Sequence, residues 1–178
     1  MSVRPGVRLA LDWGDARIGV ARSDPAGLLA FPYATVPAGA GEQVALVALV
    51  REAAPLEVIV GLPRSLSGGE GPAAAKNRTR ATALAGVLVG LDPPVPVRLV
   101  DERLTTVTAS RRLREGGRKA RDQRQVIDAA AAVTILEHAL AVEAARNLPP
   151  GELVSAPDAS SRAAASAGED DRQPGEMQ

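Results

Sequence analysis

The chain has 178 residues with no cysteine, one histidine, and 21 basic against 21 acidic side chains. This composition excludes disulfides, thiolate metal sites and histidine-rich metal centres, so any metal must be held by oxygen ligands. The 46% hydrophobic content is enough for one buried core, no apolar run reaches the roughly 20 residues of a membrane span, and the N-terminus lacks a secretory signal, so we expect a cytoplasmic domain.

The first half of the chain predicts three antiparallel strands, a crossover helix and a strand buried on both faces. These elements are expected over residues 7–12, 18–23, 28–36, 41–54 and 57–62. The turn at Gly14 and Asp15 is too short for a helix, so the first two strands form a hairpin. Pro32 indicates that the third strand lies at a sheet edge or contains a bulge.

The second half predicts a helix, a fifth strand and two further helices. They are expected over residues 72–89, 97–102, 104–115 and 123–146. Pro72 suits a first helical turn, and Asp122 with Gln125 resembles a capping box for the last helix. The order βββαβαβαα predicts an α/β fold, a mixed five-stranded sheet of three antiparallel strands and then a parallel βαβ unit, flanked by helices.

Charge is distributed unevenly along the chain. From Pro149 onward, clustered proline, glycine, serine and acidic residues predict a disordered acidic tail over 149–178, which leaves 1–148 as the folded domain. Within that domain, the segment 98–124 carries nine basic and four acidic side chains. Such a segment fits a polyanionic partner, and the alternative is an ordinary solvated helix face.

Acidic residues mark the ends of two predicted strands. Asp12 ends the first strand, and Asp101 and Glu102 end the fifth. Ligands of sheets with parallel strands lie beyond the carboxyl ends of those strands, so these acids point to one rim. The alternative for Asp12 is a simple role as a turn former.

Asp128 is unusual because it lies inside the last predicted helix, too far from the start to cap it. A carboxylate among apolar neighbours needs a metal ion, an arginine or a proton, and the alternative to a metal is a salt bridge to Arg103 or Arg124. With Asp12 and the acidic pair, Asp128 completes the minimum set of carboxylates that holds one or two Mg²⁺ ions.

Three further features of the sequence each allow two roles or one. The glycine-rich loop 63–71 lies on the same rim but lacks the elements of a P-loop, so it is either a ligand-covering loop or an ordinary connection. Thr105 and Thr106 begin a helix, where their hydroxyls either cap the backbone or contact phosphate. His138, alone on an apolar helix, is expected to be structural.

Four blocks of this sequence, in order and spacing, resemble the RuvX family, also called YqgF, of RNase H-like proteins. The blocks are LALDWGDARIGVARSD, VIVGLPRSLSGGEG, VDERLTT and IDAAAAVTILEHAL. The family is described as candidate nucleases of pre-16S rRNA and, formerly, as candidate Holliday junction resolvases. Trp13 and Arg64 depart from the small or aliphatic residues expected at those positions.

The resemblance implies a metal-dependent endonuclease that uses Mg²⁺ or Mn²⁺ to cut structured RNA at the 5′ end of a 16S rRNA precursor in ribosome biogenesis. Its implied metal ligands are Asp12, the pair Asp101 and Glu102, and Asp128. Glu102 is favoured over Asp101, since adjacent strand residues point to opposite faces, which makes Asp12, Glu102 and Asp128 the catalytic acids. The residues expected to hold the RNA backbone are Arg103, Thr105, Thr106, Arg112, Arg118, Lys119 and Arg121.

Two other functions remain open from the sequence. The same chemistry could cut branched DNA, because nothing in the chain separates readers of the RNA 2′-hydroxyl from readers of DNA. The fold could also serve as a non-catalytic RNA-binding factor in ribosome assembly. An ATPase of the actin type is disfavoured, since it needs two such domains around a cleft. Neither the number of metal ions nor the oligomeric state follows from the sequence.

Overall fold

A computed structural model of the chain describes residues 3–63, 71–101 and 120–156, with side chains in the last segment described from Ala129 onward. The elements in chain order are β1 (Arg8–Trp13), β2 (Arg17–Ser23), β3 (Ala30–Pro37), α1 (Glu42–Ala53), β4 (Glu57–Leu62), α2 (Pro72–Leu88), β5 (Val97–Asp101), α4 (Ala120–Arg146) and β6 (Glu152–Leu153). The helix expected over 104–115 lies outside the described residues. In the part that is described, no helix is long and apolar enough to cross a membrane.

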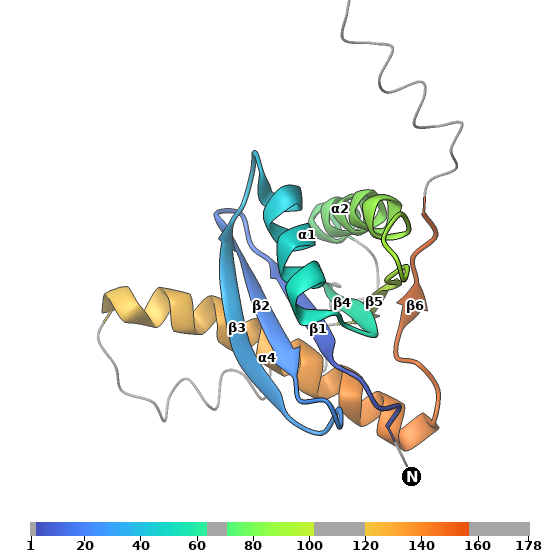
Figure 1. Ribbon diagram of the computed structural model, residues 1–178. Coiled ribbons are helices and arrows are strands. Elements are labelled where there is room, and N and C mark those ends of the chain that lie inside the picture. The colour runs from blue at the N-terminus through green and yellow to red at the C-terminus, as the bar shows by residue number, and fades with distance from the viewer. Residues whose placement is uncertain (1–2, 64–70, 102–119, 157–178) are drawn as a thin grey trace, which may run out of the picture.

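The sheet confirms the expected mixed topology. Its strand order is β3-β2-β1-β4-β5-β6 (Figure 1). The β1–β2 and β2–β3 pairs are antiparallel, whereas β1–β4 and β4–β5 are parallel. Pro32 lies in the edge strand β3 opposite Ala21, where the β2–β3 register shifts, so both a sheet edge and an irregularity are present there.

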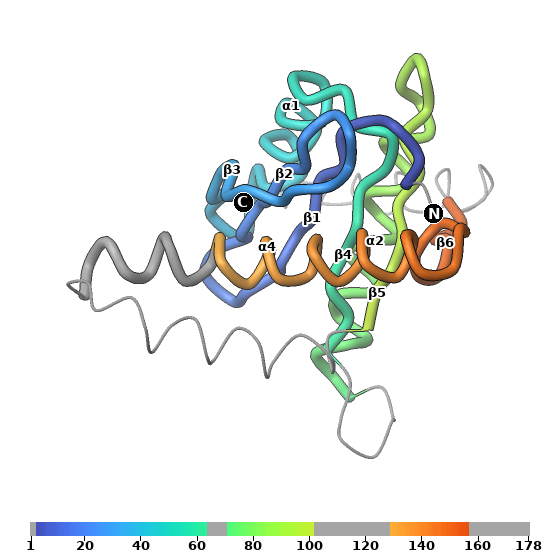
Figure 2. Tube along the Cα trace, turned by 90° about the horizontal axis from the view of Figure 1, so that it is seen from below, coloured from blue at the N-terminus to red at the C-terminus, as the bar shows by residue number. Residues whose placement is uncertain are grey.

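Two layers of helices cover the two faces of the sheet. Leu9 and Leu11 of β1 share one hydrophobic cluster with α1 and α2, whereas Ala10, between them in sequence, belongs to a second cluster with α4. Figures 1 and 2 show α4 crossing the strands on the face opposite α1 and α2. Because side chains alternate along a strand, successive residues of β1 contact opposite helix layers.

Small residues determine how closely α4 packs against the sheet. Ala10 and Ala21 face Ala132 and Ala139 in the second cluster, and all four are fully buried. Alanine against alanine lets the helix backbone lie close to the strands, and the larger Ile59, Ile135 and Leu136 fill the remaining space. This packing holds α4 across the sheet.

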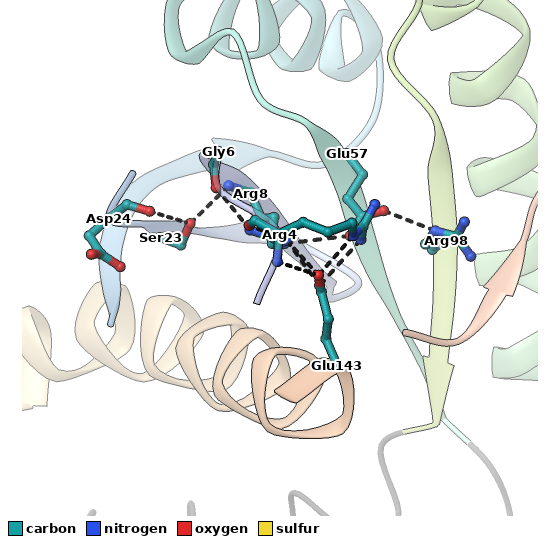
Figure 3. A network of polar contacts seen from close by, with 8 residues as sticks. All are labelled: Arg4, Gly6, Arg8, Ser23, Asp24, Glu57, Arg98 and Glu143. Atoms are coloured by element: carbon teal, nitrogen blue, oxygen red, sulfur yellow. Dashed lines mark hydrogen bonds and ion pairs between the residues drawn. The ribbon is translucent and has the colours of Figure 1, made fainter. Parts of the chain in front are cut away.

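A buried ion network joins the same layers at the amino end of β1 (Figure 3). Glu143 of α4 accepts hydrogen bonds from Arg8 Nη2 at 2.9 and 3.0 Å and from Arg4 Nε at 2.8 Å. Glu57 of β4 accepts from Arg4 Nη2 at 2.6 Å and from Arg98 Nε of β5 at 2.9 Å. Arg8, Glu57 and Glu143 are at most 1% exposed, so the network ties four elements through groups that have left water.

The carboxylate of Glu143 is held in its charged form. Burial by itself would raise the pKa of this group, but the hydrogen bonds from Arg4 and the charges of Arg8 and Arg4 outweigh burial and lower the pKa below its ordinary value. A depressed pKa in the folded state adds stability that is present above the pKa of the unfolded chain and lost as the pH falls through the folded value.

The C-terminal boundary differs from the prediction of a tail that begins at Pro149. The chain after α4 returns to the sheet, where β6 pairs with β5, and Val154 donates a backbone hydrogen bond to Val97. Gly151 adopts φ +68°, and a Cβ there would collide with the carbonyl oxygen of Leu99. The sequence does not predict this strand, because two residues are too few for an alternating pattern. Residues 157–178 lie outside the described residues.

We predict that Glu143→Gln destabilises the protein by about 3–5 kcal/mol at neutral pH, because the substitution leaves buried guanidinium groups without their counter-charge. Chemical denaturation across pH gives the measurement. The difference from the parent should shrink in acid, as the pH falls below the ordinary pKa of a glutamate and through the lowered pKa of Glu143 in the folded state. Glu152→Gln is the control, since its ion pair with Arg78 is exposed and should contribute about 0–1 kcal/mol. Equal effects of both substitutions would contradict the role given to the network.

We predict that a chain truncated after Leu148 melts at a lower temperature than one truncated after Ala156. The shorter form loses β6 and the two hydrogen bonds of 2.6 and 3.1 Å that Arg78 donates to Glu152. It also leaves the edge of β5 unpaired. Truncation after Ala156 should leave the melting temperature at the parent value. Identical melting of all three forms would show that the last strand contributes nothing to stability.

Candidate active site at the carboxyl ends of the central strands

The carboxyl ends of β1, β4 and β5 meet at one rim of the sheet. In the parallel register, Leu11 aligns with Val60 and Val60 with Leu99, and Leu62 aligns with Asp101. The strand-end acids Asp12 and Asp101 are therefore brought to the same rim, one on each side of β4. This is the arrangement that the sequence predicts for a ligand site.

The two described acids differ in the face toward which they project. Asp12 follows the alternation of Ala10 and lies on the α4 side of the sheet, whereas Asp101 follows Leu99 and lies on the side of α1 and α2. Both side chains are partly exposed and both have interaction partners. Asp101 thus shares the rim of Asp12 but not its face.

Glycines flank Asp12 on both neighbouring strands. Gly19 of β2 is its register partner, and Gly61 of β4 follows Val60, the partner of Leu11. Neither neighbour carries a side chain on the α4 face beside the carboxylate. A larger residue at either position would place a side chain beside the carboxylate of Asp12 on this face.

Asn77 of α2 supports this rim and was not identified from the sequence. Its side chain is 5% exposed, and Nδ2 donates a hydrogen bond of 3.2 Å to the carbonyl oxygen of Gly61. The contact fixes the helix that follows the rim loop against the strand between the two acidic strands. The sequence carries no signal for this role, because Asn77 lies between Lys76 and Arg78 and its burial depends on a tertiary contact.

A second pair missed by the sequence reading lies on the surface of the rim. Lys76 Nζ contacts Asp15 Oδ1 at 3.1 Å, and the side chains are 53% and 98% exposed. This ion pair joins the turn after β1 to the first turns of α2. Water screens such a pair, so it orients the turn without adding much stability.

The remaining predicted site residues lie outside the described part of the chain. Asp128 belongs to the backbone of α4, but its side chain is not described, and neither are the side chains of Glu102, Arg103, Thr105, Thr106, Arg112, Arg118, Lys119 and Arg121. Among the side chains that are described, no group of three or more acidic, histidine or cysteine residues could hold a metal ion. His138, which is expected from the sequence to be structural, is half-buried in α4.

Asp12 offers carboxylate oxygens, which are ligands of hard divalent cations, and the sequence contains no cysteine that could offer a thiolate.

The sheet has the mixed topology, and β1 the acidic end, that the resemblance of the sequence implies. The sequence profile of the RuvX family, described as Holliday junction resolvase, matches residues 6–142. This chain belongs to the RuvX family.

Curated relatives agree with that assignment. A protein of Nocardioides is 55% identical over 157 residues, covering 85% of this chain and 98% of its own. One of Streptomyces coelicolor is 58% identical over 155 residues, covering 84% and 89%. Both are named as candidate pre-16S rRNA nucleases. The structure of Thermus thermophilus RuvC has 17% identity and a TM-score of 0.47 over 83% of this chain and 99% of that chain.

We predict that Asn77→Ala lowers the free energy of unfolding by about 1 kcal/mol, because the carbonyl group of Gly61 loses a buried donor. Urea denaturation measures this change. Thr79→Ala is the matched control on the same helix, since its hydroxyl only donates to Ala75 on an exposed surface. A loss in the control as large as that in Asn77→Ala would contradict a specific role for the Asn77 contact.

Proposed function

We propose that this protein is a metal-dependent endonuclease that hydrolyses phosphodiester bonds in the 5′ region of a 16S rRNA precursor. The observation that carries this proposal is the identity of 55–58% to relatives with that name over 84–85% of the chain. The position of Asp12 at a strand end flanked by glycines supports it independently. Such a role places the protein in the cytoplasm, where ribosomes are assembled.

Asp12, Glu102 and Asp128 are the proposed metal ligands and catalytic acids. The choice of Glu102 over Asp101 is supported by Asp101 itself, which follows Leu99 and lies on the face opposite Asp12. Asp128 precedes Ala132 by four residues, about one turn of α4, and Ala132 packs against the sheet. Mg²⁺ or Mn²⁺ bound there supplies Lewis-acid stabilisation and an activated water for attack on phosphorus.

Substrate binding is assigned to the basic segment between β5 and α4. Arg103, Thr105 and Thr106 follow the acidic pair directly in sequence and would contact the phosphate nearest the cut. Arg112, Arg118, Lys119 and Arg121 would hold the backbone further along. Guanidinium and ammonium groups neutralise phosphates without reading bases, so specificity has to come from the shape of the RNA or from contacts elsewhere on the protein.

Cleavage of branched DNA is the second candidate function. The description of the matching family as Holliday junction resolvase favours it, and the same acids would serve. The names of the relatives at higher identity favour RNA. A direct comparison of a precursor RNA with a four-way DNA junction as substrates distinguishes the two.

We predict that Asp128→Asn abolishes cleavage of a precursor RNA and also the thermal stabilisation that millimolar Mn²⁺ gives the parent. In EDTA the variant should be as stable as the parent or more stable, because the substitution removes repulsion among neighbouring carboxylates. Thermal melts with EDTA and with Mn²⁺, beside the cleavage assay, provide the measurement. Asp15→Asn is the control, a nearby acid that is fully exposed on the rim turn.

A salt bridge to Arg103 or Arg124 leads to the opposite result. Removing one partner of such a bridge leaves an uncompensated charge, so Asp128→Asn would then be less stable with or without the metal. A variant that loses stability in EDTA and keeps its response to Mn²⁺ refutes the three-acid site.

A further inference from the structure

The chain that follows α4 returns to the sheet and lies along the outer edge of β5 (Figure 1). We define this strap as residues 147–154, which include β6. The β6 residues pair with β5, and Val154 donates a backbone hydrogen bond of 2.9 Å to the carbonyl oxygen of Val97. The family profile matches residues 6–142, so the strap lies beyond the part of the chain that the profile covers.

The strap approaches β5 most closely just before the acidic end of that strand. Gly151 has φ +68°, a backbone conformation that favours glycine, and a Cβ on it would collide with the carbonyl oxygen of Leu99. The same Cβ would lie 2.9 Å from Cγ2 of Val100, which is also too close. Leu99 and Val100 directly precede Asp101, the last residue of β5. A glycine at position 151 is therefore what lets the strap lie against this part of the strand.

The strap also reaches the neighbouring strand, through α2. Glu152 accepts hydrogen bonds of 2.6 and 3.1 Å from Nη1 and Nη2 of Arg78. A paired contact of this kind fixes the orientation of both side chains. Asn77, the residue before Arg78, donates a hydrogen bond to the carbonyl oxygen of Gly61 near the carboxyl end of β4. Contacts of the strap thus lead toward the ends of both β4 and β5.

The strap changes β5 from an edge strand into an interior strand. In the described sheet β5 lies between β4 and β6, so without β6 it would be paired with β4 alone. The end of a strand that is paired on one side opens more readily than one that is paired on both sides. A metal ligand has to be held within about 0.5 Å of its binding position, so freedom at this strand end would lower the metal affinity of the rim.

We propose that Gly151 is a positioning residue for the metal site at the rim. By letting the strap lie against β5, it holds the strand end that carries Asp101 and leads into the proposed ligand Glu102. This role rests on the proposed nuclease function. Gly151 contacts neither the metal nor the RNA in this assignment and acts through the strand. Residues that fix the ligands of a metal from outside the ligand set change metal affinity by about 10–100-fold.

Binding of Mn²⁺ to the full chain without RNA tests this role. The electron paramagnetic resonance signal of free Mn²⁺ measures the affinity, at a temperature where circular dichroism shows every variant to be folded. We expect Gly151→Ala to bind Mn²⁺ about tenfold more weakly, because the added Cβ displaces the strap from β5. In cleavage assays, the Mn²⁺ concentration for half-maximal rate should rise by the same factor, with the rate at saturating Mn²⁺ near that of the parent.

Gly41→Ala is the matched control. Gly41 also has a positive φ, +88°, but no atom of the described residues lies within 4 Å of a Cβ placed there. The control should therefore melt at a lower temperature because of backbone strain and bind Mn²⁺ as the parent does. Equal weakening in both glycine variants would show a general loss of stability and overturn the proposal. Parent-like Mn²⁺ binding by Gly151→Ala would overturn it as well.

Glu152→Gln tests the strap in a chain whose folding is not at risk, because the ion pair that it removes is exposed. The substitution loosens the strap from α2, and we expect Mn²⁺ binding to weaken by about threefold with a nearly unchanged melting temperature. If Gly151→Ala does not fold, this variant decides, and parent-like Mn²⁺ binding by Glu152→Gln then overturns the proposal.

Failure of the proposed function is read from the parent chain. A parent that binds Mn²⁺ but does not cleave precursor RNA refutes the nuclease function and leaves the positioning role of Gly151 standing. A parent that does not bind Mn²⁺ refutes the metal dependence, and the positioning role fails with it.

Discussion

The pairing of Glu143 with Arg8 and Arg4 is the contact on which the arrangement of layers depends. Small apolar residues let α4 approach the sheet but fix its position along the strands only weakly, because one alanine contact resembles the next. The carboxylate of Glu143 has a single location where its charge is compensated, 2.9 Å from Arg8 Nη2. A buried ion pair of this kind specifies an arrangement more than it stabilises it. In this fold it sets where along the sheet α4, and with it Asp128, must lie.

The rim and the ion network occupy opposite ends of the same strands. At the amino ends, Arg8, Glu57 and Glu143 are buried in ion pairs, whereas at the carboxyl ends Asp12 is partly exposed between glycines. The buried charges hold the framework together at one end of the strands, and the candidate site lies at the other end.

Most of the fold could be predicted from the sequence because its elements carry strong local signals. The continuous apolar run of β4, the short turn after β1 and Pro72 at the start of α2 each identified an element close to its observed bounds. Contacts between elements could not be predicted in the same way. The network of Arg4, Glu57 and Glu143 joins residues up to 139 positions apart, and β6 is too short for any periodicity. In the candidate site, the sequence indicated Asp12 and its rim, but Asn77 depends on a tertiary contact.

The order in which a ribosome releases the chain gives these distant contacts a further consequence. Arg4 and Arg8 emerge first, yet their counter-charge at Glu143 and the strand that closes β5 come only after the whole sheet has been made. During synthesis the nascent domain therefore carries unpaired arginines and an open sheet edge, features that favour chaperones and other polyanionic or strand-forming partners. The edge of β5 is covered only when Glu152 and Leu153 arrive, so a nascent chain that stops before β6 keeps this edge unpaired.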